Sequence, residues 1–103
     1  MKVVWTELAA DKWEQIATYI FTEFGFEAVE EYREETQQYE DAILTNPQIG
    51  AIEPLLYNRS YEYRSVVVHR KTKMVYYVDG ETIVIANVWD TRQEPMNQSA
   101  KTR

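Results

Sequence analysis

The residues best suited to chemistry are four basic side chains near the end of the sequence, Arg64, Arg70, Lys73 and Arg92. They occur within or beside runs of β-prone residues, and guanidinium and ammonium groups of this kind bind phosphates and carboxylates. Arg64 and Arg70 would be about 20 Å apart on one strand at ~3.3 Å per residue. The set therefore suits an extended partner, a nucleic-acid strand or a peptide, better than a compact anion. Strand-end charges that discourage edge pairing are an equally open interpretation.

Other reactive groups are sparse. His69 is the only histidine, and alternation along the strand directs it away from Arg64 and Lys73, so we expect an ordinary half-buried or surface residue near a turn. With one histidine, no cysteine and carboxylates spread along a helix, we expect no metal site and no cofactor. The sequence has no glycine-rich phosphate loop and no nucleophile motif. Residue chemistry alone favours a binding protein, with nuclease activity as the weaker alternative.

The charge of the chain is unevenly distributed. The net charge is -6, and residues 7–41 contain eleven acidic and two basic side chains, whereas residues 57–92 contain six basic and four acidic ones. A positive field over the whole domain, typical of proteins that bind nucleic acid through phosphates, is absent. We expect the acidic run at residues 27–35 to be a solvated helix face rather than a docking surface.

Length and composition indicate one domain. A chain of 103 residues with 45% hydrophobic composition can bury one modest core. The lack of cysteine fits a reducing compartment, and we expect a cytoplasmic protein without a secretion signal or a membrane span.

Local signals predict an α+β fold in which a helical hairpin lies on an antiparallel sheet, in the order β-α-α-β-β-β. A strand at residues 3–5 precedes a helix capped by Thr6 and ended by Gly25, and a second helix runs from about Glu27 to Asn46. Residues 47–60 are expected to form an irregular surface loop. Three strands follow, so we assign residues 1–95 to the domain and residues 96–103 to a polar, disordered tail.

The expected turns set the register of the last three strands. A two-residue turn at Asp79–Gly80 would place Tyr76 opposite Ile83, and a tight turn at Lys71–Thr72 would place Val66 opposite Tyr77. The helices would then cover the bulkier face, which holds Tyr63, Val67, His69, Met74, Tyr76, Val78, Ile83, Ile85 and Trp89. The uncovered face would hold Val66, Val68, Val75, Val84, Ala86, Val88 and the expected target-binding residues Arg64, Arg70, Lys73, Tyr77 and Arg92.

Several short motifs, in this order and spacing, resemble the RelE/ParE superfamily of bacterial toxins. They are V-V-W-T-x-x-A at the first helix, Asn46-Pro47-x-x-Gly50, the run Y-R-S-V from Tyr63, the run M-V-Y-Y-V-D-G from Met74 and the run I-V-I-x-x-V-W-D-x-R from Ile83. The resemblance covers residues 3–95. It implies the hairpin-on-sheet fold, a growth-inhibiting toxin of a type II toxin–antitoxin (plasmid stabilisation) module, and a cognate antitoxin that is usually acidic or amphipathic where it binds the toxin.

Two branches of this superfamily imply different mechanisms. The RelE-like branch cleaves mRNA on the ribosome without metal and would use Arg64, Lys73 and Arg92, yet Val66 is apolar and no tyrosine or histidine follows Arg92. Losing a proton-transfer group costs about 10²–10⁴ in rate. The ParE-like branch, with DNA gyrase as the implied target, resembles this chain better. A ribosome-dependent endoribonuclease, a non-toxic orphan binding domain and self-association through an uncovered apolar groove stay open.

Overall fold

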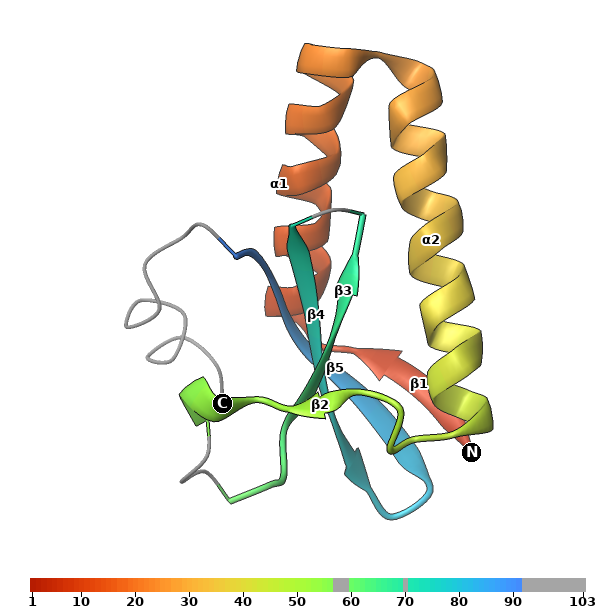
Figure 1. The fold of residues 1–103 in the computed structure, drawn as a ribbon, viewed down its shortest axis with the longest axis vertical. Helices are drawn as coiled ribbons and strands as arrows, with labels where there is room; N and C mark the ends of the chain where they lie inside the picture. The colour runs from red at the N-terminus through yellow and green to blue at the C-terminus, as the bar shows by residue number, and fades with distance from the viewer. Residues whose placement is uncertain (57–59, 70, 92–103) are drawn as a thin grey trace.

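The structure, a computed structural model, describes residues 1–56, 60–69 and 71–91. A hairpin of two helices forms one layer and a five-stranded sheet forms the other (Figure 1). The elements in chain order are β1 (Lys2–Trp5), α1 (Glu7–Phe24), α2 (Phe26–Thr45), β2 (Ala51–Ile52), the 3₁₀ turn η1 (Pro54–Leu56), β3 (Arg64–Val68), β4 (Thr72–Asp79) and β5 (Thr82–Asp90). The predicted α+β class and element order are confirmed, with β2 and η1 added.

The two helices begin and end where local signals place them. The Thr6 side chain accepts a hydrogen bond from the Ala9 N–H at 3.0 Å and donates one to the Ala86 carbonyl at 3.1 Å, so the helix cap also fastens α1 to β5. Gly25, with φ +93°, is the single residue between the helices. Because a positive φ disfavours residues with a Cβ atom, glycine fits this sharp reversal of the chain.

The sheet has the strand order β1-β5-β4-β3-β2. β1 pairs in parallel with β5, and the other neighbours are antiparallel. β1 therefore lies at one edge and the two-residue β2 at the other. The hairpin extends past the end of the sheet at which β3 turns into β4 (Figure 1).

Both predicted turn registers are wrong. Val66 pairs with Met74 rather than with Tyr77, because residues 69–71 separate β3 from β4 and His69 adopts φ +46°. Asp79 pairs with Thr82, so the loop of the next hairpin is Gly80–Glu81 and Gly80 takes the positive φ. This register places Tyr76 opposite Ile85, and a bulge between Val75 and Tyr76 then moves the partner of Val75 to Asn87.

These shifts change which side chains lie against the helices. The main core joins α1 and α2 to the sheet side chains Val66, Val68, Met74, Tyr76, Ile83, Ile85 and Val88. A smaller second core on the other side of the sheet contains Leu56, Tyr63, Val75, Ala86 and Trp89. The predicted placement of Val66, Val68 and Val88 on the uncovered face, and of Tyr63 and Trp89 under the helices, is therefore wrong, because a shift by an odd number of residues moves a side chain to the opposite face.

The predicted loop at residues 47–60 is also more structured than expected. Its described part forms β2 and η1, and it buries Glu53 fully and Leu56 almost fully. The second core forms because η1 and its neighbours lie over the sheet face that the helices leave uncovered. No described helix is long and apolar enough to cross a membrane.

Tyr32 lies at the centre of the main core and gives a test of its packing. Its ring stacks on Trp13 at 4.8 Å between centroids and is tilted against His69 at 5.7 Å. The Tyr32 hydroxyl is buried and has no hydrogen-bond partner among the described residues. Burial raises the pKa of Tyr32 above its ordinary value.

Tyr32→Phe is expected to raise the free energy of unfolding at neutral pH by about 1 kcal/mol, since it removes an unsatisfied buried hydroxyl. Above about pH 10 the unfolded tyrosine ionises while the folded one stays neutral, so the original protein loses stability as the pH rises and the variant loses less. Urea denaturation at about pH 8 and about pH 11 measures both effects. A variant less stable than the original protein at both pH values would contradict this account.

Candidate functional site

Arg64 begins β3 and holds the loop that follows α2. Its guanidinium donates to the Gly50 carbonyl at 2.8 Å and to the Gln48 carbonyl at 3.4 Å, and it forms an ion pair of 2.9 Å with Glu62. The side chain is 19% exposed. Most of the donor capacity of Arg64 is therefore used within the chain.

The same loop is held from beneath by the Tyr76 hydroxyl. This hydroxyl donates to the Pro47 carbonyl at 2.8 Å and accepts the Gly50 N–H at 2.9 Å. A Cβ atom on Gly50 would lie 2.7 Å from that hydroxyl, which explains why glycine occupies the position. Burial raises the pKa of Tyr76, while the Gly50 hydrogen bond and the charge of Arg64 act in the opposite direction.

Lys73 lies in β4 and binds a buried carboxylate. Its Nζ atom is 2.8 Å from Oε1 of Glu53, whose side chain is fully buried, while the Lys73 side chain is 26% exposed. Oε1 of Glu53 also accepts from the Ser65 hydroxyl at 2.9 Å, and Oε2 accepts from the Leu55 N–H at 3.2 Å. The contacts of the Glu53 carboxylate tie the end of β2 to β3 and β4 on the side of the sheet away from the helices.

Arg64 and Lys73 lie on opposite faces of the sheet, so the prediction that they share one face is wrong. Arg64 pairs with Tyr76, which belongs to the helix-side core, whereas Lys73 pairs with Trp89, which belongs to the second core. The physical reason is that the partner of Val66 is Met74 and not Tyr77, a shift of three residues, and an odd shift moves the side chains of β3 to the opposite face. Arg64 and Lys73 cannot converge on one bound group.

Tyr77 lies on the face away from the helices, as predicted, and belongs to an aromatic cluster. It stacks on Tyr61 at 4.1 Å between centroids and meets Tyr63 edge to face at 5.2 Å. Burial raises the pKa of Tyr77, and the neighbouring Tyr61 and Asp79 raise it further. Since Tyr61 is 38% exposed, this cluster presents an accessible aromatic surface beside the second core.

His69 is a half-buried residue at a turn, as predicted. Its backbone N–H donates to Oε2 of Glu35 at 2.7 Å, and its Nδ1 atom lies 3.7 Å from Oε1 of the same carboxylate. These contacts join the β3–β4 turn to α2 and support the left-handed conformation of His69. The described contacts of His69 therefore position the turn against α2.

The remaining sequence predictions can be placed only in part. Arg70, Arg92 and the predicted tail at residues 96–103 lie outside the described residues. Within residues 1–56, 60–69 and 71–91, no group of three metal-binding side chains converges.

The sequence analysis missed the residues that bind the predicted basic side chains within the chain. The sequence analysis names no internal partner for Arg64 or Lys73 and expects Glu35 on a solvated helix face, whereas in the structure Gly50 accepts from Arg64, Glu53 pairs with Lys73 and Glu35 accepts from the His69 N–H. The available signal was weak: Glu53 is a lone carboxylate before Pro54 in a segment of otherwise polar and small or apolar residues. The described site is suited to binding a partner through its exposed aromatic and partly exposed basic groups. Its basic groups already have partners within the chain.

Comparison with known proteins agrees with this architecture. The sequence model of the family described as ParE toxin of type II toxin-antitoxin system, parDE, matches residues 3–95. A search of curated proteins finds no match.

A solved structure described as the chromosomal ParDE TA system from P. aeruginosa has a similar fold, with a TM-score of 0.71 and 18% sequence identity over 89% of this chain and 97% of that chain. At that identity the structure supports the fold, and the family assignment comes from the sequence model. With nine-tenths of its length matched and its helical hairpin packed on a mostly antiparallel sheet, the chain belongs to the ParE toxin family of type II toxin–antitoxin systems.

Proposed function

We propose that this toxin inhibits growth by binding a cellular target, with DNA gyrase as the candidate, and not by cutting RNA. Membership in the ParE family implies an antitoxin partner, and we propose that residues 1–95 form the toxin domain and that it acts in the cytoplasm. The observation that carries the proposal is the separation of Arg64 and Lys73 on opposite faces. Cleavage of RNA needs basic groups that converge on one phosphate in the transition state.

The target contact is proposed on the sheet face away from the helices. Tyr77 and Tyr61 offer stacked aromatic surface there, and Lys73 adds a partly exposed cation. Aromatic side chains of this kind are frequent anchors in protein interfaces. Arg70 and Arg92 are proposed to extend the contact, while Arg64 acts by holding the loop at residues 47–50.

Induction of the protein without an antitoxin is expected to stop bacterial growth, and the purified protein is expected to increase gyrase-dependent cleavage of plasmid DNA. Arg92→Ala is expected to reduce the cleavage at least tenfold, as expected for an interface anchor. Arg33→Ala, which removes an exposed positive charge from α2, is the matched control and should leave the cleavage unchanged.

Two results would overturn the proposal. Codon-positioned cuts in ribosome-bound mRNA, without gyrase-dependent DNA cleavage, would assign the toxin to ribosome-dependent RNA cleavage. Normal growth in cells that contain the folded protein would assign it to non-toxic binding domains.

A further inference from the structure

A groove lies between the two helices beside the end of β1. Its volume is about 250 Å³, and the side chains of Trp5 and Trp13 line it together with Glu14 on α1 and Arg33 and Glu40 on α2. Both tryptophans are only half-buried. Because tryptophan is enriched at the centre of protein interfaces, two such rings in one groove indicate a binding site.

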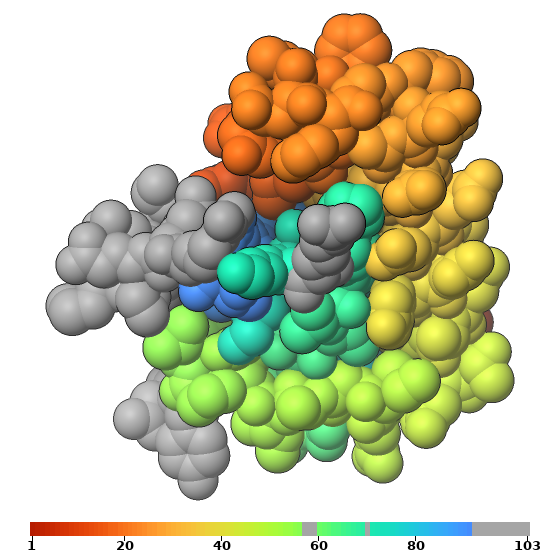
Figure 2. Space-filling model, turned by 45° about the horizontal axis from the view of Figure 1, so that its top comes forward, coloured from red at the N-terminus to blue at the C-terminus, as the bar shows by residue number. Residues whose placement is uncertain are grey.

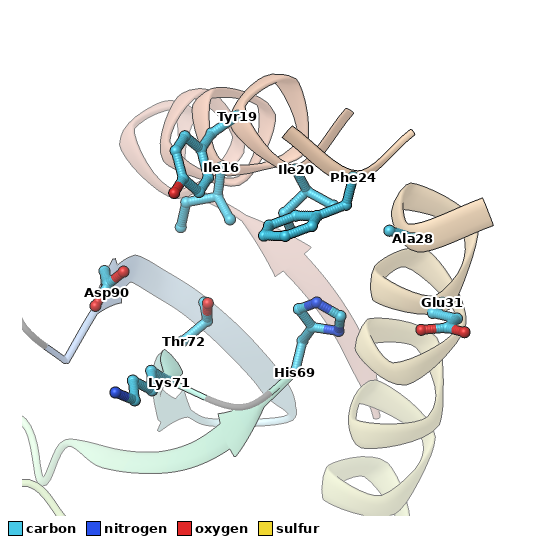
Figure 3. Close-up of a pocket in the computed structure, with 10 residues that line it drawn as sticks. All are labelled: Ile16, Tyr19, Ile20, Phe24, Ala28, Glu31, His69, Lys71, Thr72 and Asp90. Carbon is cyan, nitrogen blue, oxygen red and sulfur yellow. The ribbon is translucent and has the colours of Figure 1, made fainter. Parts of the chain in front are cut away.

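This groove is separate from the cleft between the outer end of the hairpin and the end of the sheet. Ile16, Ile20 and Phe24 form part of the apolar wall of that cleft (Figure 3), and none of the described residues that line the cleft lines the groove. In Figure 2 the outer end of the hairpin stands above the atoms of β3 and β4, whereas the groove lies further along the hairpin toward β1. Substitutions in the groove therefore leave the lining of the cleft unchanged.

Hydrogen bonds to α2 hold both indole rings of the groove in place. The Trp5 indole N–H donates to Oε1 of Glu40 at 2.9 Å, and the Trp13 indole N–H donates to the Thr36 hydroxyl at 2.9 Å. The Thr36 hydroxyl in turn donates to the Tyr32 carbonyl at 2.7 Å. Since both indole N–H groups are used, the rings offer a partner mainly their faces, which attract cations.

A cation of the chain itself already lies against one of these rings. The guanidinium carbon of Arg33 is 5.5 Å from the centroid of the Trp13 ring. Arg33 is also paired with Glu30 at 3.3 Å, and its side chain is 61% exposed. The contact between Arg33 and Trp13 shows that the groove accommodates a guanidinium group beside its aromatic wall.

Two carboxylates of the groove have no cationic partner among the described residues. Glu14 on α1 and Glu40 on α2 take part in none of the ion pairs of this part of the chain. Glu40 is half-buried, and the charge of Arg33 is already balanced by Glu30. A carboxylate partly removed from water without a cation costs free energy, which a bound cation would offset.

We propose that the groove binds an arginine side chain of a protein partner, stacked against the indole rings and hydrogen-bonded to Glu14 and Glu40. Arginine fits better than lysine, because its planar group stacks on aromatic rings and donates in several fixed directions. The volume of the groove is below the usual range for small-molecule pockets, so the groove accepts one side chain rather than a metabolite.

Charge and exposure favour a protein arginine over other occupants. Nucleic acid and a second copy of this chain would both bring negative charge to a hairpin that is already acidic. A free guanidine would gain only ion pairs in contact with water, which contribute little. The residues beside a docked arginine would also cover Ala10 and Gln37, which are exposed at the groove. The inference is independent of the proposed function, whose target contact lies on the sheet.

The test is a selection of displayed nonapeptides with a fixed central arginine and randomised flanking positions. The library is first depleted on the Glu14→Lys variant and then selected on the original chain. Enriched peptides are expected to shift the NMR signals of the Trp5 and Trp13 indole N–H groups and to leave the signal of Trp89, which belongs to the second core, unchanged. Replacing the central arginine with glutamine should weaken binding about tenfold.

Single variants of the chain separate the groove from the general acidity of the hairpin. Glu14→Gln and Glu40→Gln should each weaken binding about fivefold, and the new side chain at position 40 still accepts the indole hydrogen bond. Glu34→Gln removes an exposed carboxylate of α2 that does not line the groove, so it should bind within about twofold of the original chain. Arg33→Ala frees an indole face and removes a positive charge, so it should bind about threefold more tightly.

Five outcomes would overturn the inference. No peptide survives the selection, or the glutamine peptide binds as tightly as the arginine peptide. Glu34→Gln weakens binding as much as Glu14→Gln, which would assign the binding to overall charge. Agmatine, a free guanidine, binds as tightly as the best peptide, which would make the groove a small-molecule site. The chain forms a dimer that the peptide dissociates, which would make a second copy the occupant.

Discussion

Lys73→Met is expected to lower the free energy of unfolding by about 3 kcal/mol, the lower end of the range for removing one partner of a buried ion pair. The substitution leaves the fully buried Glu53 carboxylate with hydrogen bonds from Ser65 and Leu55 but without its cation. The lower end applies because a quarter of the Lys73 side chain remains exposed to solvent. Urea denaturation monitored by tryptophan fluorescence measures the loss.

A double variant separates the charge from the packing. In Glu53→Gln with Lys73→Met both charges are absent, so much of the lost stability should return. Lys71→Met removes an exposed lysine two residues away and should change stability by less than about 0.5 kcal/mol. If Lys73→Met were as stable as the original protein, Lys73 would be free to serve the target contact alone, and the structural role of the pair would be wrong.

Arg64→Ala is expected to lower the free energy of unfolding by about 2–3 kcal/mol, within the range for hydrogen bonds made by a charged group. The variant loses the donors to the Gly50 and Gln48 carbonyls, and the loop between α2 and β2 then depends on the Tyr76 hydroxyl. The exposed ion pair with Glu62 should add little. Thermal and urea denaturation give the change, and hydrogen exchange at Gly50 reports on the loop.

The same variant distinguishes a structural arginine from a target-binding one. Arg64→Lys keeps the charge but offers a different donor geometry, so it should be intermediate in stability. Arg33→Ala, on the exposed face of α2, should be close to neutral. Full stability of Arg64→Ala together with loss of gyrase-dependent cleavage would place Arg64 in the target contact and contradict its role as a clamp.

The helical hairpin could be predicted because its signals are local. Thr6 caps α1, Gly25 reverses the chain, and apolar residues recur at helical spacing, so each element follows from residues a few positions apart. For the same reason, the sequence could also indicate which segments form strands. The hairpin-on-sheet architecture then follows, because two amphipathic helices need a sheet to cover their apolar stripes.

The candidate site could not be predicted in the same way, because its geometry depends on single-residue differences in pairing. Alternation correctly placed Tyr77 away from the helices, yet the turn that begins at His69 changed the pairing of β3 with β4 and so placed Arg64 on the face opposite to Lys73. The sequence of a short polar stretch hardly reveals whether its turn has two residues or three. The two turn lengths direct the side chains of the next strand to opposite faces of the sheet.

The sequence by itself thus determined the order and type of the elements, the acidic character of the hairpin and membership in a toxin family. Only the tertiary structure decided that Lys73 pairs with Glu53, 20 residues away, that Arg64 clamps a loop, and that a cleft with an apolar helical wall lies between the hairpin and the end of the sheet. The physical reason is that caps and amphipathic stripes depend on near neighbours, whereas the partner of a charge depends on where distant segments of the chain meet.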